Sequence, residues 1–252
     1  MLLSVVVLTR NSAKTLDNCL TSAKQLQPEI IVVDDGSTDG TLSIAQSHRA
    51  KIFKRKLVSF GAQKQFALEQ AGGEWALVLD SDEQLDAALA DEITRTLKKP
   101  GSTSAFRVPR RNRYFCQWLK HGGKYPDYQT RLLKRSECKF SDDIVHEKIV
   151  CSGNVGTLIN PLDHDTYPDL ETYFEKLALF ARFRGELLLK NGTRPSFVNA
   201  VRFCLLRPAW RFKRRYIFKA GFLDGLPGFL ACVHDALTEI FGYFCLTRLA
   251  LK

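Results

Sequence analysis

Residues 30–41 read IIVVDDGSTDGT, an apolar run that ends abruptly in an acidic turn. The run at 30–33 is rich in β-branched residues and predicts a buried strand. A helix cap explains the polar residues 37–39. It does not explain the two adjacent carboxylates, Asp34 and Asp35, that follow the strand directly. One of these two can accept a hydrogen bond from a nucleobase N–H or a ribose hydroxyl.

Strand and helix patterns alternate on both sides of this stretch. Apolar runs predict strands at residues 3–8, 30–33, 51–53 and 75–79. Helical patterns lie between them: after a cap at Asn11 or Ser12, from Thr41, and over 62–71. Nearly continuous apolar strands separated by helices are typical of a parallel sheet covered on both faces. We therefore predict an α/β fold whose ligands bind beyond the carboxyl ends of the strands.

A second acidic cluster, DSDE at residues 80–83, follows the strand predicted at 75–79. Asp80 and Asp82 are spaced i, i+2, so both side chains can reach one cavity once the strand breaks into a turn. Hard oxygen ligands suit Mg²⁺ or Mn²⁺, ions that also bind diphosphate oxygens. The pair therefore predicts a divalent cation that neutralises a departing diphosphate.

Three segments, 5–11, 32–41 and 77–83, resemble glycosyltransferase family 2 in their order and spacing. The resemblance covers roughly residues 2–165 and implies the GT-A fold, a nucleotide-diphosphate sugar donor and inversion at the anomeric carbon. It also implies a set of donor-binding and metal-binding residues. By this resemblance the nucleoside pocket is lined by Thr9, Arg10 and Asp35, and Asp34 belongs with them to the donor-binding residues. Lys64 helps hold the nucleotide, Asp80 approaches the ribose and the metal, and Asp82 binds the metal. Gln65 departs from the pattern, since many relatives carry Asn there.

Inversion requires a base that takes the proton of the acceptor hydroxyl on the face opposite the leaving group. The candidate is Glu147, in a Val-His-Glu segment similar to one in relatives, with Asp142 and Asp143 as rivals. A loop pair without catalytic function is the alternative reading of this segment. By the same resemblance, His146 completes the metal shell or contacts phosphate. Arg131, in a segment that resembles a recurring one of the family, contacts phosphate on donor or acceptor.

The last third of the chain is basic and aromatic. No acidic residue lies between Glu186 and Asp224, and arginines and lysines there alternate with Phe, Trp and Tyr. This composition suits amphipathic helices at a membrane interface, although a basic face packed on the domain is an alternative. Single-stranded nucleic acid can use such surfaces, but no nucleic-acid module is recognisable and no such partner is expected. Charged residues interrupt the apolar stretch after residue 221, so we do not expect it to span a bilayer. The predicted division is a GT-A domain at 1–165 and a helical, membrane-associating region at 166–252.

Composition limits the partners and the compartment. With 37 basic and 27 acidic residues the net charge is +10, which favours an anionic partner. The seven cysteines are odd in number and form no CxxC pair, so we expect reduced thiols in a cytosolic protein.

Segments 75–83, 125–134, 145–147 and 221–228 resemble the subfamily that adds a hexose, often glucose, to the lipopolysaccharide inner core. The resemblance implies a peripheral enzyme on the inner face of the cytoplasmic membrane, with a lipid-linked saccharide as acceptor and UDP as the expected carrier. Two other classes stay open. A nucleotidyl- or phosphoryl-transfer enzyme could use the same acidic turns, and a non-enzymatic binding protein would not need them.

Overall fold

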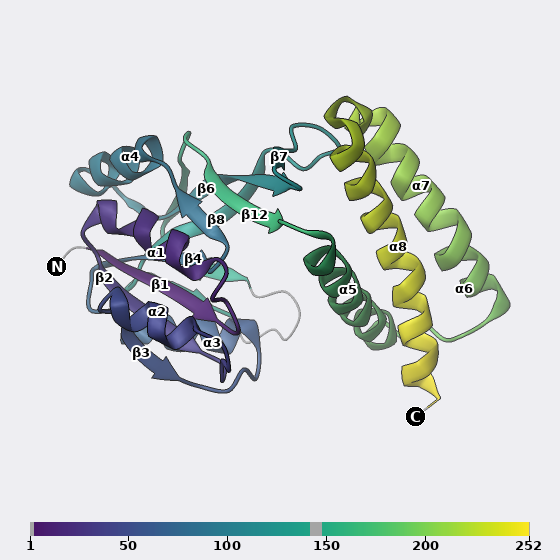
Figure 1. Ribbon diagram of the computed structural model, residues 1–252, viewed down its shortest axis with the longest axis horizontal. Helices are drawn as coiled ribbons and strands as arrows, with labels where there is room; N and C mark the ends of the chain where they lie inside the picture. The colour runs from purple at the N-terminus through teal and green to yellow at the C-terminus, as the bar shows by residue number, and fades with distance from the viewer. Residues whose placement is uncertain (1–2, 142–147, 252) are drawn as a thin grey trace. The chain divides into compact units, whose positions relative to one another are not determined.

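The computed structural model describes residues 3–141 and 148–251 (Figure 1). The chain forms two compact units. The first consists of Met1–Arg110 and Tyr128–His164, and the second of Arg111–Asp127 and Asp165–Lys252. A segment from the middle of the chain, residues 111–127, thus belongs with the C-terminal helices, a grouping that the sequence patterns did not indicate.

A mostly parallel sheet organises the first unit. Its strands run in the order β3-β2-β1-β4-β8-β6-β12-β5. The four parallel neighbours are β3 (Lys51–Lys54), β2 (Glu29–Asp34), β1 (Leu3–Thr9) and β4 (Trp75–Asp80). The sheet continues through β8 (Asp127–Lys134), antiparallel to β4, and then β6 (Thr103–Tyr114), β12 (Leu162–Tyr167) and β5 (Glu83–Leu85). The four predicted strands are thus confirmed as β1 to β4, and the α/β class with them.

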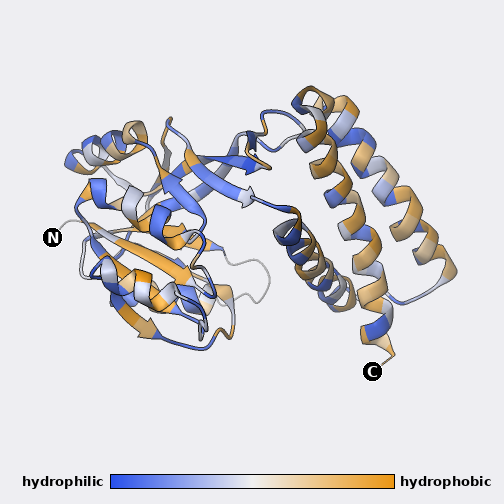
Figure 2. Cartoon of the chain, in the orientation of Figure 1, coloured by the Kyte–Doolittle hydropathy of each residue, from blue (hydrophilic) through white to orange (hydrophobic). Residues whose placement is uncertain are grey.

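Helices cover both faces of this sheet, which explains why its central strands are apolar throughout. Val5 and Val7 of β1 point into a core shared with α1 (Leu16–Ala23) and α4 (Ala87–Lys98). Val6 points into the opposite core, which contains residues of α3 (Phe60–Gln70). Helix α2 (Thr41–Ser47) begins at Thr41, the residue at which the sequence predicted a helix to start. Figure 2 shows the apolar colour along β1 and its neighbours.

The predicted cap of α1 is wrong. The helix begins at Leu16, and its N-cap residue, Thr15, makes no side-chain cap hydrogen bond. The Asn11 side chain accepts a hydrogen bond from the amide of Thr38 instead, at 2.8 Å. Ser12 contributes its main-chain carbonyl, which accepts from the Leu16 amide at 2.9 Å. The side chain of Asn11 is therefore used to bind the neighbouring turn, not the helix.

Two cysteines are paired, which corrects the expectation that all thiols are reduced. Strands β9 (Cys138–Phe140) and β10 (Ile149–Cys151) are antiparallel, and their register places Cys138 opposite Cys151. The two form a disulfide, while the five other cysteines are free. Strand pairing brings together residues that a separation of 13 positions does not mark as partners.

The short strands β7 (Gln117–Trp118) and β11 (Asn154–Thr157) each pair with β6.

The second unit is a helical bundle. Helix α5 (Leu170–Lys190) packs along α8 (Gly225–Ala250), and a further helical stretch runs from residue 197 to residue 218. That stretch comprises α6 (Phe197–Val201), a π-helical turn at Arg202–Leu206, α7 (Arg207–Lys213) and a second π-helical turn at Arg214–Phe218. A short 3₁₀ turn at Gly221–Asp224 precedes α8. The first unit has a similar 3₁₀ turn at Lys24–Leu26.

Glycines allow α5 and α8 to approach closely. A Cβ added at Gly185 would lie 2.6 Å from the Cβ of Cys245, and one at Gly242 would lie 2.4 Å from Cγ of Arg184.

Within the described chain one helical stretch, Gly221–Ala250, is long and apolar enough to cross a membrane by length and composition. Core helices of soluble proteins meet the same criterion, so this finding alone does not place the helix in a bilayer.

Candidate functional site

The acidic turns predicted to bind a ligand lie at adjacent strand ends. In the sheet register Asp34 of β2 is opposite Thr9 of β1, and Asp80 of β4 is opposite Leu8. The carboxyl ends of the three strands therefore bring both acidic clusters to one edge of the sheet. This is the position at which parallel α/β sheets bind ligands.

Asp34 is buried and bonded within the protein. Its side chain accepts hydrogen bonds from Thr9 Oγ1 at 3.0 Å and from the amides of Gly36 and Ser37 at 3.0 and 2.9 Å. Only 1% of the residue is exposed. Asp34 thus holds the shape of the turn from inside.

Asp35, the next residue, faces the edge of the site. It accepts from Arg10 Nη1 at 3.0 Å through one oxygen and from the Leu57 amide at 2.8 Å through the other. The Arg10 side chain is 69% exposed, so its guanidinium remains accessible to a ligand. The structure thus brings Thr9, Arg10, Asp34 and Asp35 together at these strand ends, and the hydrogen-bond partners of Asp34 all lie within the protein.

An ion-pair network surrounds Asp80. Arg131 on β8 places Nη2 2.5 Å from Oδ2 of Asp80 and 2.5 Å from Oε1 of Glu83. Arg110 on β6 places Nη1 3.2 Å from the same Glu83 oxygen and 3.9 Å from Asp80 Oδ2. Lys64, on α3, is buried, and its positive charge lowers the pKa of Asp80. Three cations therefore converge on two carboxylates at the end of β4.

These charges set the ionisation of the network. Burial raises the pKa of Asp80, but the positive charges of Arg131, Lys64 and Arg110 outweigh it and lower that pKa to about 2. Burial lowers the pKa of Arg131, and the carboxylates of Asp80 and Glu83 raise it by more. Asp80 is therefore ionised at neutral pH and can bind a cation or accept a hydrogen bond.

Asp82 lies in the turn after β4, next to a histidine for which the sequence suggested no role. Its Oδ2 is 3.3 Å from Nε2 of His164 on β12, and both side chains are largely buried. The pairing of β12 with β5 sets His164 opposite Glu83. Asp82 and Asp80 thus belong to one polar site at the end of β4.

Two members of this site had no role assigned from the sequence: Glu83, which belongs to the predicted acidic cluster, and Arg110. Glu83 is fully buried, and its Oε2 accepts a hydrogen bond from the main-chain amide of Asp80 at 3.0 Å. Its position directly after the acidic pair was a usable signal. Arg110 had none, because it reaches the site from β6, almost thirty residues along the chain.

Glu147, His146, Asp142 and Asp143 lie outside the described residues. Their predicted roles as base, metal ligand or phosphate contact stay predictions.

The donor chemistry of the described site suits a shared cation. Among residues 3–141 and 148–251, no group of three or more His, Cys, Asp or Glu side chains is placed to hold a metal. Asp80 and Asp82 supply two carboxylates at one strand end. Mg²⁺ is commonly bound by one or two carboxylates together with substrate phosphates and water, not by a complete protein cage. The residues therefore fit a divalent cation that binds together with a diphosphate.

Comparison with known proteins agrees with this geometry. The sequence pattern described as Glycosyl transferase family 2 matches residues 4–152, more than half of the chain. The chain belongs to glycosyl transferase family 2. The family match covers both acidic turns and the sheet strands up to β8, and it makes the protein a glycosyltransferase.

A curated relative extends the similarity beyond the family domain. The Lipopolysaccharide core biosynthesis glycosyltransferase LpsC of Rhizobium meliloti (strain 1021) is 28% identical over 247 residues, covering 93% of this chain and 88% of LpsC. The similarity therefore includes the helical unit.

Solved structures support the fold of this family 2 chain. The mannosyltransferase PcManGT from Pyrobaculum calidifontis, in complex with GDP-Man and Mn²⁺, aligns with a TM-score of 0.54 at 15% identity. The alignment covers 99% of this chain and 86% of PcManGT. The 1–349 fragment of S. aureus TarS aligns with a TM-score of 0.50 at 18% identity, over 97% and 91% of the two chains. The predicted GT-A type fold followed by C-terminal helices is thereby confirmed.

Proposed function

We propose that this chain is an inverting, divalent-metal-dependent hexosyltransferase. It takes a hexose, with glucose the expected sugar, from a nucleotide-diphosphate donor, with UDP the expected carrier. The acceptor is a lipid-linked saccharide such as the lipopolysaccharide inner core. The observation that carries the proposal is the pair Asp80 and Asp82 at the end of β4, beside the cations Arg131 and Lys64. The similarity to LpsC supports the acceptor class.

The donor is bound at the carboxyl ends of β1, β2 and β4. Thr9, Arg10 and Asp35 line the nucleoside side of the site, and Asp34 keeps their turn in place through its internal hydrogen bonds. Arg10 is exposed enough to contact a nucleotide directly.

The diphosphate is bound next to Asp80, where Lys64 and Arg131 supply positive charge. Asp80 and Asp82 would hold Mg²⁺ or Mn²⁺. When bound, the ion would neutralise the charge that develops on the nucleoside diphosphate as its bond to the sugar breaks. His164 fixes the orientation of Asp82 through their 3.3 Å contact.

The acceptor hydroxyl loses its proton to a carboxylate on the opposite face of the sugar. We assign this role to Glu147, with Asp142 and Asp143 as rivals. His146 would contact the metal or phosphate. These four assignments rest on the resemblance of the segment to relatives, since the residues lie outside those that the structure describes.

The helical unit offers a surface for an anionic membrane. The side chains of Lys213 and Arg214 are exposed beside Trp210, Ile217 and Phe218, which are more than half exposed. Aromatic and basic side chains together suit the headgroup region of a bilayer.

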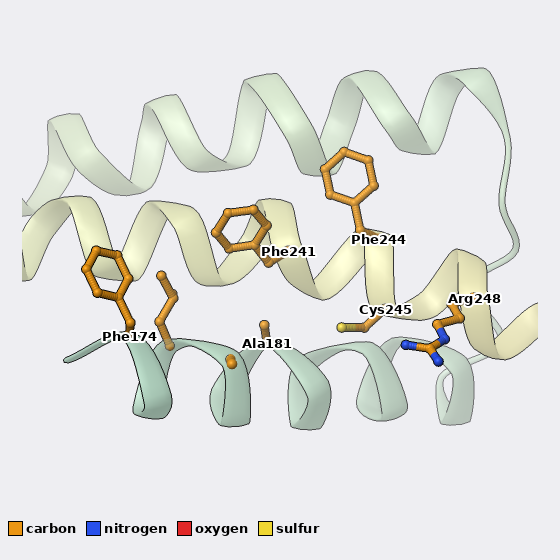
Figure 3. A pocket seen from close by; sticks show the side chains of 8 residues that line it. Phe174, Ala181, Phe241, Phe244, Cys245 and Arg248 are labelled. Atoms are coloured by element: carbon orange, nitrogen blue, oxygen red, sulfur yellow. The ribbon is translucent and has the colours of Figure 1, made fainter. Parts of the chain in front are cut away.

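A groove between α5 and α8 is a second apolar feature of the helical unit. It has a volume of about 460 Å³ and is lined mainly by apolar residues, including Phe174, Phe241 and Phe244 (Figure 3). Figure 3 shows Arg248 at one end of it. We propose that these apolar and basic surfaces hold the enzyme peripherally on the inner membrane. The cytoplasmic face follows from the resemblance to enzymes of the lipopolysaccharide inner core, and we expect no nucleic acid among the partners.

The test is a panel of nucleotide sugars incubated with the purified chain, Mg²⁺ or Mn²⁺ and a lipid-linked saccharide extract. We expect nucleoside diphosphate to be released with one donor only, and release to require the metal. Glu147→Gln should abolish release. Persistent release in Glu147→Gln would move the base to Asp142 or Asp143, and release of pyrophosphate would indicate a nucleotidyltransferase instead.

A further inference from the structure

The guanidinium of Arg131 is shared between two carboxylates of different accessibility. Both contacts use the same Nη2 atom, at 2.5 Å from Asp80 and 2.5 Å from Glu83. The Asp80 side chain is 36% exposed, whereas that of Glu83 is 0% exposed. A solute can therefore reach Asp80, but it cannot reach Glu83.

Glu83 is also fixed by its other contacts. Its second oxygen accepts from the main-chain amide of Asp80 at 3.0 Å, and Arg110 donates to its first oxygen at 3.2 Å. Removing one partner from a buried, hydrogen-bonded ion pair is strongly unfavourable, because the remaining charge has no solvent. Of the two bonds that hold Arg131, the bond to Asp80 is thus the one that can exchange.

A cation that binds Oδ2 of Asp80 must compete with Arg131. The guanidinium occupies Oδ2 of Asp80, the oxygen that lies nearest to Arg110 as well. The Nε of Arg131 is buried and has no hydrogen-bond partner among the described residues. Arg131 therefore keeps hydrogen-bonding capacity that its two carboxylates do not use. Guanidinium groups bind phosphate oxygens through charge-assisted hydrogen bonds.

We propose that Arg131 is an exchangeable internal cation and that Glu83 is the residue that positions it. Without donor, Arg131 neutralises Asp80. When a divalent cation and a nucleoside diphosphate bind, Asp80 turns to the divalent cation, and the released guanidinium contacts the diphosphate while Glu83 keeps it in place. The inference rests on the proposed function, and it predicts that Arg131 opposes binding of the metal alone but favours binding of the diphosphate.

The test measures Mn²⁺ alone by electron paramagnetic resonance and UDP at saturating Mn²⁺ by calorimetry, using the full chain. Arg131→Gln removes the competitor, so Mn²⁺ alone should bind about 5-fold or more tightly, while UDP binds about 5-fold or more weakly. Glu83→Gln removes the fixed partner, leaving Arg131 to Asp80, so Mn²⁺ alone should bind more weakly. A purely structural role would weaken both ligands in both variants.

Lys134→Gln is the matched control. Lys134 lies on the same strand as Arg131 but pairs with Glu137 at 2.6 Å, so neither affinity should change. If Arg131→Gln does not fold, Arg131→Lys replaces it. The lysine side chain is shorter and binds two carboxylates less well than a guanidinium, so Mn²⁺ alone should again bind more tightly than to the unmodified chain.

Unchanged or weaker Mn²⁺ binding in the Arg131 variant overturns the exchange. That result is distinct from failure of the proposed function, in which the unmodified chain itself binds neither Mn²⁺ nor any nucleoside diphosphate.

Discussion

The two units use buried charge in different ways. In the first unit, Arg131 and Glu83 are almost fully buried, but the Asp80 carboxylate that they surround is 36% exposed. In the second unit, Glu239 lies between Arg184 and Arg211, and its side chain is 5% exposed. The first network thus ends in a group that a ligand can reach. The second has its carboxylate enclosed.

The two units also differ in how many large apolar side chains they expose to solvent. Most of the large apolar side chains that are exposed among the described residues belong to the helical unit, among them Phe197, Trp210 and Phe218. In the sheet unit, exposed apolar side chains such as Val58 and Ile159 are few. The comparison teaches that the sheet unit keeps reactive polar groups at strand ends. The helical unit encloses the Glu239 carboxylate between two arginines, and its exposed surface includes many apolar and basic side chains.

The largest expected effect is on chemistry in the sheet unit. Asp82→Asn removes one negative charge from the proposed metal site, and we expect the rate of nucleoside diphosphate release to fall about 1,000-fold, equivalent to about 4 kcal/mol. Circular dichroism and thermal unfolding should match those of the unmodified chain. A variant that keeps more than a tenth of the activity would show that the strand end is not the catalytic site.

The second effect is on stability in the helical unit. Glu239→Gln leaves Arg184 and Arg211 without their shared carboxylate, and we expect a loss of about 3 kcal/mol in the free energy of unfolding. Nucleotide affinity should change little. Glu175→Gln, at an exposed position on α5, is the control and should leave denaturant unfolding unaltered. If the Glu239 and Glu175 variants unfold with equal free energies, the contacts of Glu239 with Arg184 and Arg211 do not stabilise the bundle.

The third effect sharpens the assignment of the outer surface. The basic stretch read from the sequence includes Arg211 and Arg215, but these pair with Glu239 and with Asp235, the latter at 2.8 Å. The exposed pair Lys213 and Arg214 is therefore the informative one. Replacing both with Gln should weaken binding to phosphatidylserine-containing liposomes about 10- to 30-fold, since each charge contributes about 1 kcal/mol.

Lys98 and Lys99, exposed at the end of α4 in the sheet unit, give a control pair of equal charge. Liposome flotation at two salt concentrations would make the comparison. An equal loss in both double variants would mean that net charge, not the helical surface, binds the membrane.

The smallest effect concerns a structural carboxylate in the sheet unit. Burial raises the pKa of Glu29, but hydrogen bonds from Lys51, Ser4 and the Gly72 amide outweigh it and lower the pKa to about 2. Because the pKa is lower in the folded than in the unfolded chain, the stabilisation is present above pH 4.5 and is lost as the pH falls towards 2. Glu29→Gln should cost about 1 kcal/mol at pH 7, after screening at exposed Lys51.

Unfolding in urea at pH 7 and at pH 3 would measure this cost. The difference between variant and unmodified chain should shrink at the lower pH, and a difference that grows would contradict the assignment.

The central sheet and its acidic ends were predictable from the sequence because both are local signals. An apolar run such as residues 30–33 needs only its own pattern to be read as a buried strand, and the clusters at Asp34 and Asp80 follow such runs directly. The convergence of both clusters then follows from parallel pairing of neighbouring strands.

The rest depends on contacts between distant residues. Arg110 reaches Glu83 only through the pairing of the sheet, and Arg211 meets an acid 28 positions away on another helix. Its stretch of sequence has no acidic neighbour, so the arginine was read as facing outward. The disulfide of Cys138 likewise depends on strand register.

The measurement that tests the central claim most directly is the anomeric configuration of the product. An α-linked nucleotide sugar, the active donor from the panel, would be incubated with metal and acceptor, and the new glycosidic bond examined by NMR through its anomeric coupling. Single displacement at the end of β4 predicts a β-linked product that is absent in Asp82→Asn. An α-linked product would contradict the inverting mechanism and the role assigned to the acceptor base.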